Sequence, residues 1–490
     1  MPDHPYDLIV GLETHVQLLT QTKLFCRCST KFGAPPNTQT CPVCIGLPGS
    51  LPVMNREAFQ LSLQTAVALN CEIPEFTKWD RKQYYYPDLP KGYQISQYDL
   101  PMSQNGWLAI TDPKGEFQPK RIGIIRAHLE EDAGKSLHDE AQGKSDTRID
   151  LNRTGTPLLE IVSAPDIRST KETRAYLTEL KLLLTYLGVS DCNMQEGSLR
   201  VDANINIHIH TPQGKIATPI VEIKNLNSFR HIERALVYEA GRQYQAWQET
   251  GKKLGDSPKQ TRGWDDAKGI TLAQREKEES SDYRYFPDPD LCPVVTPPVE
   301  VDAIRSRQCE LPAAIRARLE KTHGITPYDS DVIVAQGREM VEYYEEVAGI
   351  AGDGKKAANW VTQEVLRVLN EQGTALASFP LDAKSLGELV KLVAAGDLEV
   401  TRAKEVFGDM VATRRSAAES MQALGIGKVD LSELEAICKE LVAANPKIVA
   451  DVKGGKQQAV GALLGQAKKR NPNANPNDVR RICLELIEKM

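Results

Sequence analysis

The sequence has no apolar run long enough to span a bilayer, although it is 490 residues long. Its N-terminal stretch MPDHPYDLIVGLE also lacks the basic segment followed by an apolar segment that a secretory signal needs. With 60 Lys and Arg against 66 Asp and Glu, the charge balance is that of an ordinary, mildly acidic globular protein. These absences predict a cytoplasmic protein with no membrane partner and with more than one domain.

Cysteine is scarce, with ten cysteines in this length. So low a cysteine content excludes a secreted scaffold held together by disulfides. Six of them are scattered, as expected of small buried apolar side chains. The other four, in FCRCSTKFGAPPNTQTCPVC, are Cys26, Cys28, Cys41 and Cys44. Two Cys pairs joined by a loop that can fold back predict a closed tetrahedral Zn²⁺ site with a structural role. A redox-active pair is the alternative interpretation.

Several catalytic motifs are also missing from the sequence. No G-x-G-x-x-G follows a predicted strand, and no G-x-S-x-G occurs. The run GIAGDGKK at 349–356 has Lys where a phosphate loop needs a Mg²⁺-binding Ser or Thr. There is no Ser-rich amidase signature, and Pro2 excludes an N-terminal Cys glutaminase. If the chain takes part in amide chemistry, its ammonia is therefore made elsewhere.

The pattern of apolar residues changes near Pro298. Before it, short alternating runs such as DANINIHIHT predict strands, interrupted by helices in AFQLSLQTAVALN and KETRAYLTELKLLLTYLG. After it, helical periodicity dominates. We predict an α+β fold: a large mixed-sheet N-terminal domain at 1–298 with a zinc-binding loop at 26–44, a helical domain at 299–410 and a small helical tail domain at 411–490. The tail has 13 Lys and Arg against nine Asp and Glu, which suits contact with a polyanion.

Acidic side chains interrupt three of the predicted strands. In GLETHVQLL, alternation sends Glu13 and His15 to one face, and in TPLLEIV Glu160 stands between apolar residues. Glu130 and Glu131 end the run RIGIIRAHL. An ionised Glu among buried apolar residues is costly unless it is paired or bound to metal. Oxygen ligands with one His fit Mg²⁺ or Mn²⁺, the ions that accompany ATP, whereas an exposed polar strand face is the simpler alternative.

Two cations stand on neighbouring strand candidates, Arg200 in EGSLRVDANINI and Lys224 in VEIKNLNSF. Their charge and strand positions predict contact with phosphate. Each could instead be a structural polar residue with a satisfied partner.

Long stretches of the chain resemble one known family. They are GLETHVQL, YYYPDLPKGYQISQYDLP, RIGIIRAHLEEDAGKS, DLNRTGTPLLEIVSAPDIRS, EGSLRVDANINI, VEIKNLNSFRHIERAL and DYRYFPDPDLCPV. They are similar to the B subunits of the tRNA-dependent amidotransferase GatCAB, and the likeness covers essentially the whole chain. It implies a glutamine-synthetase-like cradle domain and a tail domain that binds tRNA.

The resemblance also implies an activity and its partners. Members convert Glu-tRNA(Gln), and often Asp-tRNA(Asn), into the amides, using ATP, Mg²⁺ or Mn²⁺, and ammonia from an amidase A subunit beside a small C subunit. Carrying over the family's metal pocket assigns Glu13, His15, Glu131 and Glu160. Strict alternation would place Glu130, not Glu131, beside His128, so either carboxylate could be the ligand.

Two alternatives to this function stay open at the level of the sequence. The chain could be a non-catalytic, zinc-containing adaptor that binds tRNA. It could also be a free-standing ATP-dependent ligase for a small carboxylic acid, which would need no RNA.

Overall fold

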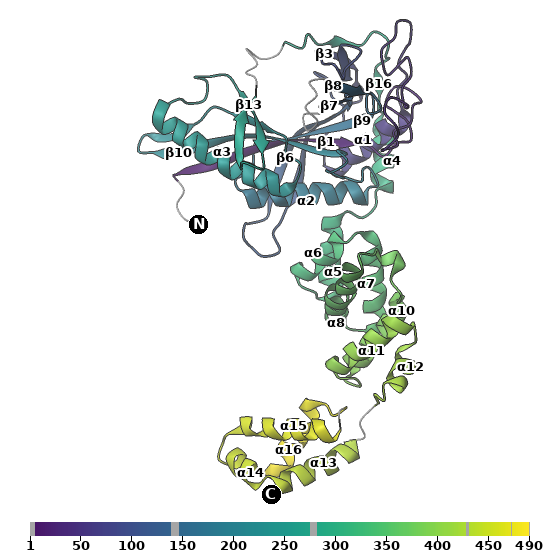
Figure 1. Cartoon of the computed structure of the whole chain (residues 1–490), viewed down its shortest axis with the longest axis vertical. Coiled ribbons are helices and arrows are strands. Elements are labelled where there is room, and N and C mark those ends of the chain that lie inside the picture. Colours follow the sequence, from purple (N-terminus) through teal and green to yellow (C-terminus); the bar gives the residue numbers. More distant parts are fainter. Residues whose placement is uncertain (1–4, 139–146, 275–281, 428–430, 472, 490) are drawn as a thin grey trace. The chain divides into compact units, whose positions relative to one another are not determined.

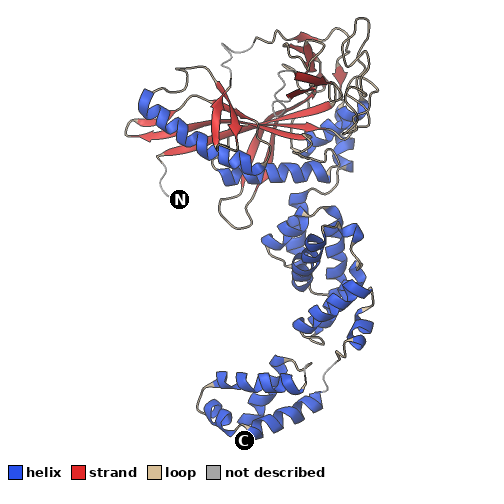
Figure 2. Ribbon diagram, viewed as in Figure 1, coloured by secondary structure: helices blue, strands red, loops and turns tan. Residues whose placement is uncertain are grey.

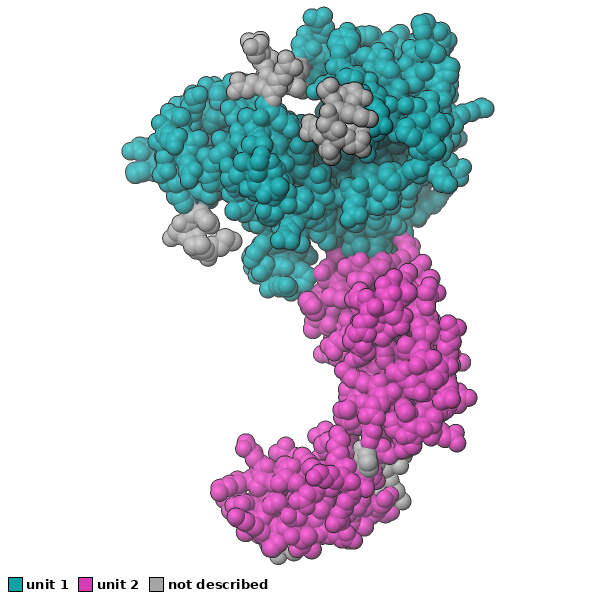
Figure 3. All heavy atoms as spheres, viewed as in Figure 1, with its two compact units in different colours: residues 1–314 teal, residues 315–490 magenta. Residues whose placement is uncertain are grey.

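The structure is a computed structural model that describes residues 5–138, 147–274, 282–427, 431–471 and 473–489. The chain divides into two compact units, Met1–Ala314 and Ile315–Met490 (Figure 3). Among the described residues, no helix is both long enough and apolar enough to cross a membrane.

The first unit is built on a mixed sheet that has nine strands in the described part of the chain. The strands are β1 Tyr6–Gln17, β5 Ser103–Ile110, β6 Lys120–Glu131, β9 Pro157–Ser163, β10 Leu199–Thr211, β11 Gly214–Ala217, β12 Val221–Lys224, β13 Gln260–Asp265 and β14 Ile270–Ala273. Their order is β14-β13-β12-β10-β1-β9-β6-β5, with β11 paired to β10. The β12–β13 pair is parallel and the other pairs are antiparallel. The predicted mixed sheet is therefore confirmed.

Helices cover one face of this sheet. They are α1 Arg56–Ala68, α2 Thr170–Tyr186 and α3 Phe229–Thr250, and α2 and α3 lie side by side along it (Figure 1). Ser169 and Ser228 cap α2 and α3 by accepting a hydrogen bond from the third backbone N–H of each helix. Buried residues such as Leu12 and Val201 face the helices, so the alternate residues of β1 and β10 point to the other face. That second face carries the polar side chains.

Three smaller sheets complete the unit. Their strands are β2 Phe76–Thr77, β3 Asp80–Gln83, β4 Tyr93–Ser96, β7 Lys135–His138, β8 Thr147–Asp150, β15 Phe286–Pro287 and β16 Val294–Val295. They pair as β15-β3-β4, β16-β2 and β7-β8, and helix α4 Pro298–Arg307 follows them.

In the described residues of the second unit, every regular element is helical (Figure 2). The α-helices of this region are α5 Pro312–His323, α6 Pro327–Ala335, α7 Arg338–Ala351, α8 Gly354–Asn359, α9 Leu366–Gln372, α10 Ala383–Ala395, α11 Val400–Thr413, α12 Ala417–Ala423, α13 Leu431–Ala444, α14 Pro446–Lys453, α15 Gly461–Arg470 and α16 Pro476–Glu488. Leu434, Leu463 and Ile482 belong to a separate small core formed by α13 to α16. The predicted order of a mixed-sheet domain followed by a helical region is confirmed, and the finer domain boundaries stay a prediction.

Candidate active site on the polar face of the sheet

Strand register assembles a polar row across four strands. On β1, His15 is paired with Arg200 of β10 on one side and with Glu160 of β9 on the other. Glu160 is in turn paired with His128 of β6. Because directly paired residues point to the same face, these four side chains lie in one line on the face that the helices leave open.

His15, Glu130 and Glu160, which we call the His15 group, offer ligand atoms within 4.8 Å of one another. His15 Nε2 lies 3.7 Å from Glu160 Oε2. His128 Nε2 lies 3.4 Å from the same oxygen and 3.9 Å from Glu130 Oε2. Carboxylates and an imidazole at this spacing could hold a hard divalent cation.

Burial and charge set the protonation of this group. Burial alone would raise the pKa of Glu160, but electrostatic interactions with His128, His15 and Lys82 outweigh burial and lower that pKa to about 2. Burial raises the pKa of Glu130, which is next to the charge of Glu160. Burial also lowers the pKa of His128 to about 4, so this imidazole is neutral near pH 7. Glu160 is therefore an ionised carboxylate at neutral pH.

Glu13, Asp202 and Glu222, the Glu13 group, form a second set of oxygens within 4.8 Å of one another. Asn204 Nδ2 donates to Glu13 Oε1 at 2.8 Å, and Lys224 Nζ donates to Asp202 at 2.6 Å. Burial would lower the pKa of Lys224, but Asp202 and Glu222 raise it to about 12. Glu13 therefore lies beside the β10 and β12 carboxylates and not within the His15 group.

Glu131 lies on the opposite face of β6, because successive residues of a strand alternate. It is paired with Pro157, accepts a hydrogen bond from Ile95 N at 3.1 Å and binds Lys91 Nζ through Oε1 at 2.6 Å. Its side chain is 3% exposed. In the structure Glu130, and not Glu131, lies beside His15 and Glu160, and the metal role that the resemblance assigns to Glu131 stays a prediction.

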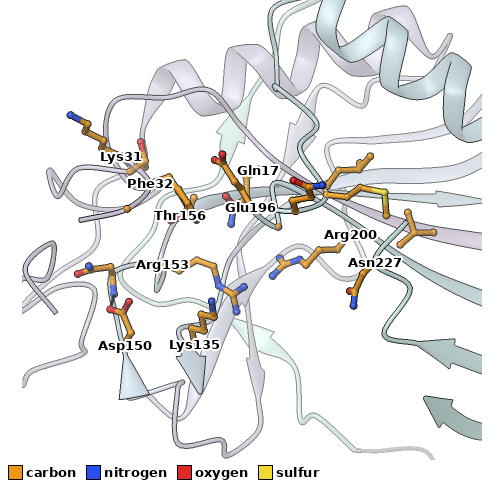
Figure 4. A pocket seen from close by; sticks show the side chains of 18 of the residues that line it. Gln17, Lys31, Phe32, Lys135, Asp150, Arg153, Thr156, Glu196, Arg200 and Asn227 are labelled. Atoms are coloured by element: carbon orange, nitrogen blue, oxygen red, sulfur yellow. Dashed lines mark hydrogen bonds between the residues drawn. The ribbon is translucent and has the colours of Figure 1, made fainter. Parts of the chain in front are cut away.

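A cavity of about 580 Å³ adjoins the Glu13 group and has a cationic lining (Figure 4). Its basic residues are Lys31, Lys135, Arg153, Arg200 and Lys224. In Figure 4, Arg153 and Arg200 point toward one another. Both approach the buried Asp132, with Arg200 Nη2 at 2.9 Å and Arg153 Nε at 3.6 Å from its oxygens.

A second cavity, of about 510 Å³, is lined mainly by aromatic rings and Lys82. Its lining residues are Lys82, Gln83, Tyr84, Tyr85, Tyr86, Asp282, Tyr283 and Arg284. Burial would lower the pKa of Lys82, but the charges of Glu130 and Glu160 raise it. This electrostatic coupling relates the tyrosine cavity to the His15 group.

The four cysteines of the predicted zinc loop come together. Their Sγ atoms lie within 4.8 Å of one another, so the cluster could bind a metal. The backbone N–H of Cys41 donates to Cys44 Sγ at 3.2 Å, as in zinc knuckles. A hydrogen bond from Cys26 lowers the pKa of Cys44, which favours its thiolate.

Sequence reasoning missed two residues near the His15 group. His128 had a signal, since it stands two positions before Glu130 in an alternating run. Lys82 had none, because β3 belongs to a separate small sheet and meets the site only in the folded chain. The predicted phosphate contacts Arg200 and Lys224 both line the larger cavity, each already paired with a carboxylate.

Comparisons with known proteins agree with this architecture. A family model described as the GatB/GatE catalytic domain matches residues 8–301, and one described as the GatB domain matches residues 342–487. A protein of Rhodopirellula baltica, named as the B subunit of aspartyl/glutamyl-tRNA(Asn/Gln) amidotransferase, is 61% identical over 487 residues, covering 99% of this chain and 98% of its own. Proteins of the same name from Carboxydothermus hydrogenoformans and Moorella thermoacetica are 45% and 44% identical, covering 99% and 98% of this chain and 99% and 100% of their own. The chain therefore belongs to the GatB family of amidotransferase B subunits, which confirms the resemblance seen in the sequence.

Proposed function

We propose that this chain is the carboxylate-activating subunit of an ATP-dependent amidotransferase, an enzyme of the ligase class. Its substrates are mischarged Glu-tRNA(Gln) and/or Asp-tRNA(Asn), and its products are Gln-tRNA(Gln) and Asn-tRNA(Asn). The observation that carries the proposal is the pair of adjacent ligand groups on one sheet face, next to a cation-lined cavity. The names of the relatives support the substrate class.

ATP is assigned to the larger cavity. Its volume of about 580 Å³ falls in the range of nucleotide-sized pockets. Asp202 lines the cavity and also belongs to the Glu13 group, so this end of the cavity adjoins that group. Arg200 and Lys224 line the cavity at the same end. The triphosphate is therefore directed toward Asp202, with Lys135 and Arg153 available to neutralise its charge.

The donor atoms of the two ligand groups fit Mg²⁺ or Mn²⁺. Carboxylate oxygens with one imidazole are ligands for hard cations, and each set already converges within 4.8 Å. We assign Glu13, Asp202 and Glu222 to one position, and His15, Glu130 and Glu160 to the other, so Glu130 replaces Glu131 as ligand. When bound, such a cation neutralises phosphate charge during transfer.

The chemistry follows from the leaving group. A carboxylate oxygen is a poor leaving group, so the side-chain carboxylate of the aminoacyl-tRNA attacks the γ-phosphorus of ATP and releases ADP. Ammonia then attacks the acyl carbon, the C–O bond to phosphate breaks, and the nitrogen loses a proton to give the amide. Lys82 and the tyrosine cavity lie on the β3 side of the His15 group, which suits entry of the acceptor there.

The proposed partner subunits are inferred from the missing amidase signature and from the names of the relatives. The sequence has no amidase signature, so an amidase A subunit supplies the ammonia, and a small C subunit completes the enzyme in the cytoplasm. The relatives are named as subunits, which supports a multi-subunit enzyme. The basic balance of 411–490 supports contact of the tail with the tRNA backbone.

Replacing Glu160 by Gln tests the function without changing side-chain size. With the partner subunits present, Glu160→Gln should abolish ATP cleavage that depends on Glu-tRNA(Gln). The exposed Glu249 on α3 offers a matched control, and Glu249→Gln should retain full turnover.

Two results would point to the alternatives. Undiminished turnover in Glu160→Gln would favour a non-catalytic zinc-containing tRNA adaptor. ATP cleavage that proceeds equally without RNA would favour a free-standing ligase.

A further inference from the structure

Lys23 is a buried lysine in an unusual setting. Its side chain is fully buried, and Nζ lies 2.7 Å from Gln39 O, 3.4 Å from Leu151 O and 3.6 Å from Cys44 Sγ. These three acceptors match the three N–H groups of an ammonium ion. In the part of the chain that the structure describes, no carboxylate forms an ion pair with Lys23, and the nearby Glu131 is already paired with Lys91.

A buried ammonium group is costly unless an anion compensates its charge. The anion on offer is the cysteine cluster. A tetrahedral zinc ion with Zn–S bonds of about 2.3 Å holds its sulfurs about 3.8 Å apart, and the four Sγ atoms already lie within 4.8 Å of one another. Four thiolates around one divalent cation leave two negative charges in excess, and the Lys23 ammonium beside Cys44 neutralises one of them.

We propose that Lys23 is the charge-compensating partner of a divalent metal held by Cys26, Cys28, Cys41 and Cys44, and that it fastens this metal site to the wall of the larger cavity. The second part rests on the carbonyls that Lys23 binds. Gln39 itself lines the cavity, and Leu151 directly precedes Asn152 and Arg153, which line it as well.

Further hydrogen bonds join the same two segments. Asn152 Oδ1 accepts from Gln39 N at 2.8 Å, and Asn152 Nδ2 donates to Pro35 O at 2.7 Å. Asn37 Nδ2 donates to Ile149 O at 2.9 Å. The metal loop and 149–153 thus form one wall of the cavity, with Lys23 buried behind it.

The test compares metal affinity in Lys23→Met with that in Lys114→Met, a control at an exposed lysine. Zn²⁺ affinity of the full-length chain is measured by competition with a chelator under reducing conditions at one fixed pH. Lys23→Met should weaken Zn²⁺ binding by about 10–100-fold, the usual effect of losing an outer partner of a metal site. Lys114→Met should leave it unchanged.

Thermal unfolding adds a readout that simple packing would not produce. In metal-loaded protein, Lys23→Met should lower the melting temperature. In metal-free protein the decrease should be clearly smaller, because the excess negative charge of four metal-bound thiolates is then absent. An equal decrease in both states would overturn the proposal.

Lys23→Gln separates charge from hydrogen bonding, and it decides the matter if Lys23→Met does not fold. It keeps a donor for the carbonyls but carries no charge, so unchanged Zn²⁺ affinity in this variant would also overturn the proposal.

ATP binding tests the link to the cavity, which rests on the proposed function. Removing Zn²⁺ from the wild-type chain and replacing Lys23 by Gln should each weaken ATP binding. If the metal affinities shift as expected but the wild-type chain binds no ATP, the proposed function fails while the role of Lys23 at the metal stands. If wild-type ATP binding is unaffected by Zn²⁺ removal, the link to the cavity is wrong.

Discussion

Glu130 and Glu131 are adjacent in the chain but point to opposite faces of β6, so they should respond to substitution in opposite ways. Glu131 is buried with Lys91, whose side chain is only 5% exposed. Replacing Glu131 by Gln keeps an acceptor for Ile95 N but leaves the Lys91 ammonium without a counter-ion. Breaking a buried ion pair in this way costs about 3–5 kcal/mol. For a unit of this size, Met1–Ala314, that corresponds to a melting temperature lower by roughly 5–8 °C.

Glu130→Gln is the matched comparison. The pKa of Glu130 is raised by burial, and its polar partner Ser96 Oγ at 3.2 Å can equally bind an amide. We therefore expect a small change in melting temperature together with loss of tRNA-dependent ATP cleavage. Adding Lys91→Met to Glu131→Gln should restore most of the lost stability, because the unpaired charge is gone.

Calorimetry of the wild type and the three variants, together with an ATP-cleavage assay, checks this contrast. The reasoning would be refuted if Glu131→Gln left stability intact while abolishing cleavage, since Glu131 would then be the ligand. It would fail equally if Lys91→Met in the Glu131→Gln background restored nothing.

Three further predictions concern pH, helix capping and salt. The folded pKa of His128, about 4, lies below its usual value near 6.5, so the unfolded chain binds the extra proton first as pH falls. In metal-free protein the His128 titration by itself should remove about 3 kcal/mol of unfolding free energy between pH 6.5 and 4, and the raised pKa of Glu130 contributes with the opposite sign. His128→Gln should therefore remove the destabilising part of this pH dependence. Because the folded pKa of Glu160 is about 2, the stability that its ionised form contributes is lost mostly below pH 4. Ser228→Ala removes the hydrogen bond to His231 N and should cost about 1 kcal/mol in denaturant unfolding, whereas Ser228→Asp should keep most of the stability. Affinity for tRNA, measured by filter binding, should fall steeply between low and high salt. Replacing the last-turn cations 468–470 of α15 should make that dependence on salt shallower. An unchanged salt dependence would show that these cations of the tail do not contact the RNA.

The sequence predicted local features of this fold well. Alternation in GLETHVQLL put Glu13 and His15 on one face, and the structure agrees. The helix predicted in KETRAYLTELKLLLTYLG is α2, followed by Gly188 at φ 67. These features depend on residues close together in the chain, so they can be read without tertiary information.

The division of the polar side chains into two ligand groups could not be predicted from the sequence in the same way. Which strands neighbour β1 is fixed by pairings across more than 140 residues, such as His15 with Glu160 and Glu13 with Asp202. Only that register separates Glu13 from His15 into two ligand groups. Alternation along β6 placed Glu130 beside His128, and the structure agrees, whereas the choice between Glu130 and Glu131 as ligand stays a prediction.

Oxygen transfer from substrate to phosphate tests the central claim most directly. Glu-tRNA(Gln) carrying ¹⁸O in its side-chain carboxylate is converted by the complete enzyme, and the released inorganic phosphate is analysed by mass spectrometry. Carboxylate activation at the His15 and Glu13 groups predicts one ¹⁸O atom in each phosphate released with product, and none above background with Glu160→Gln. Amide formation by the wild-type enzyme with unlabelled phosphate would contradict the account.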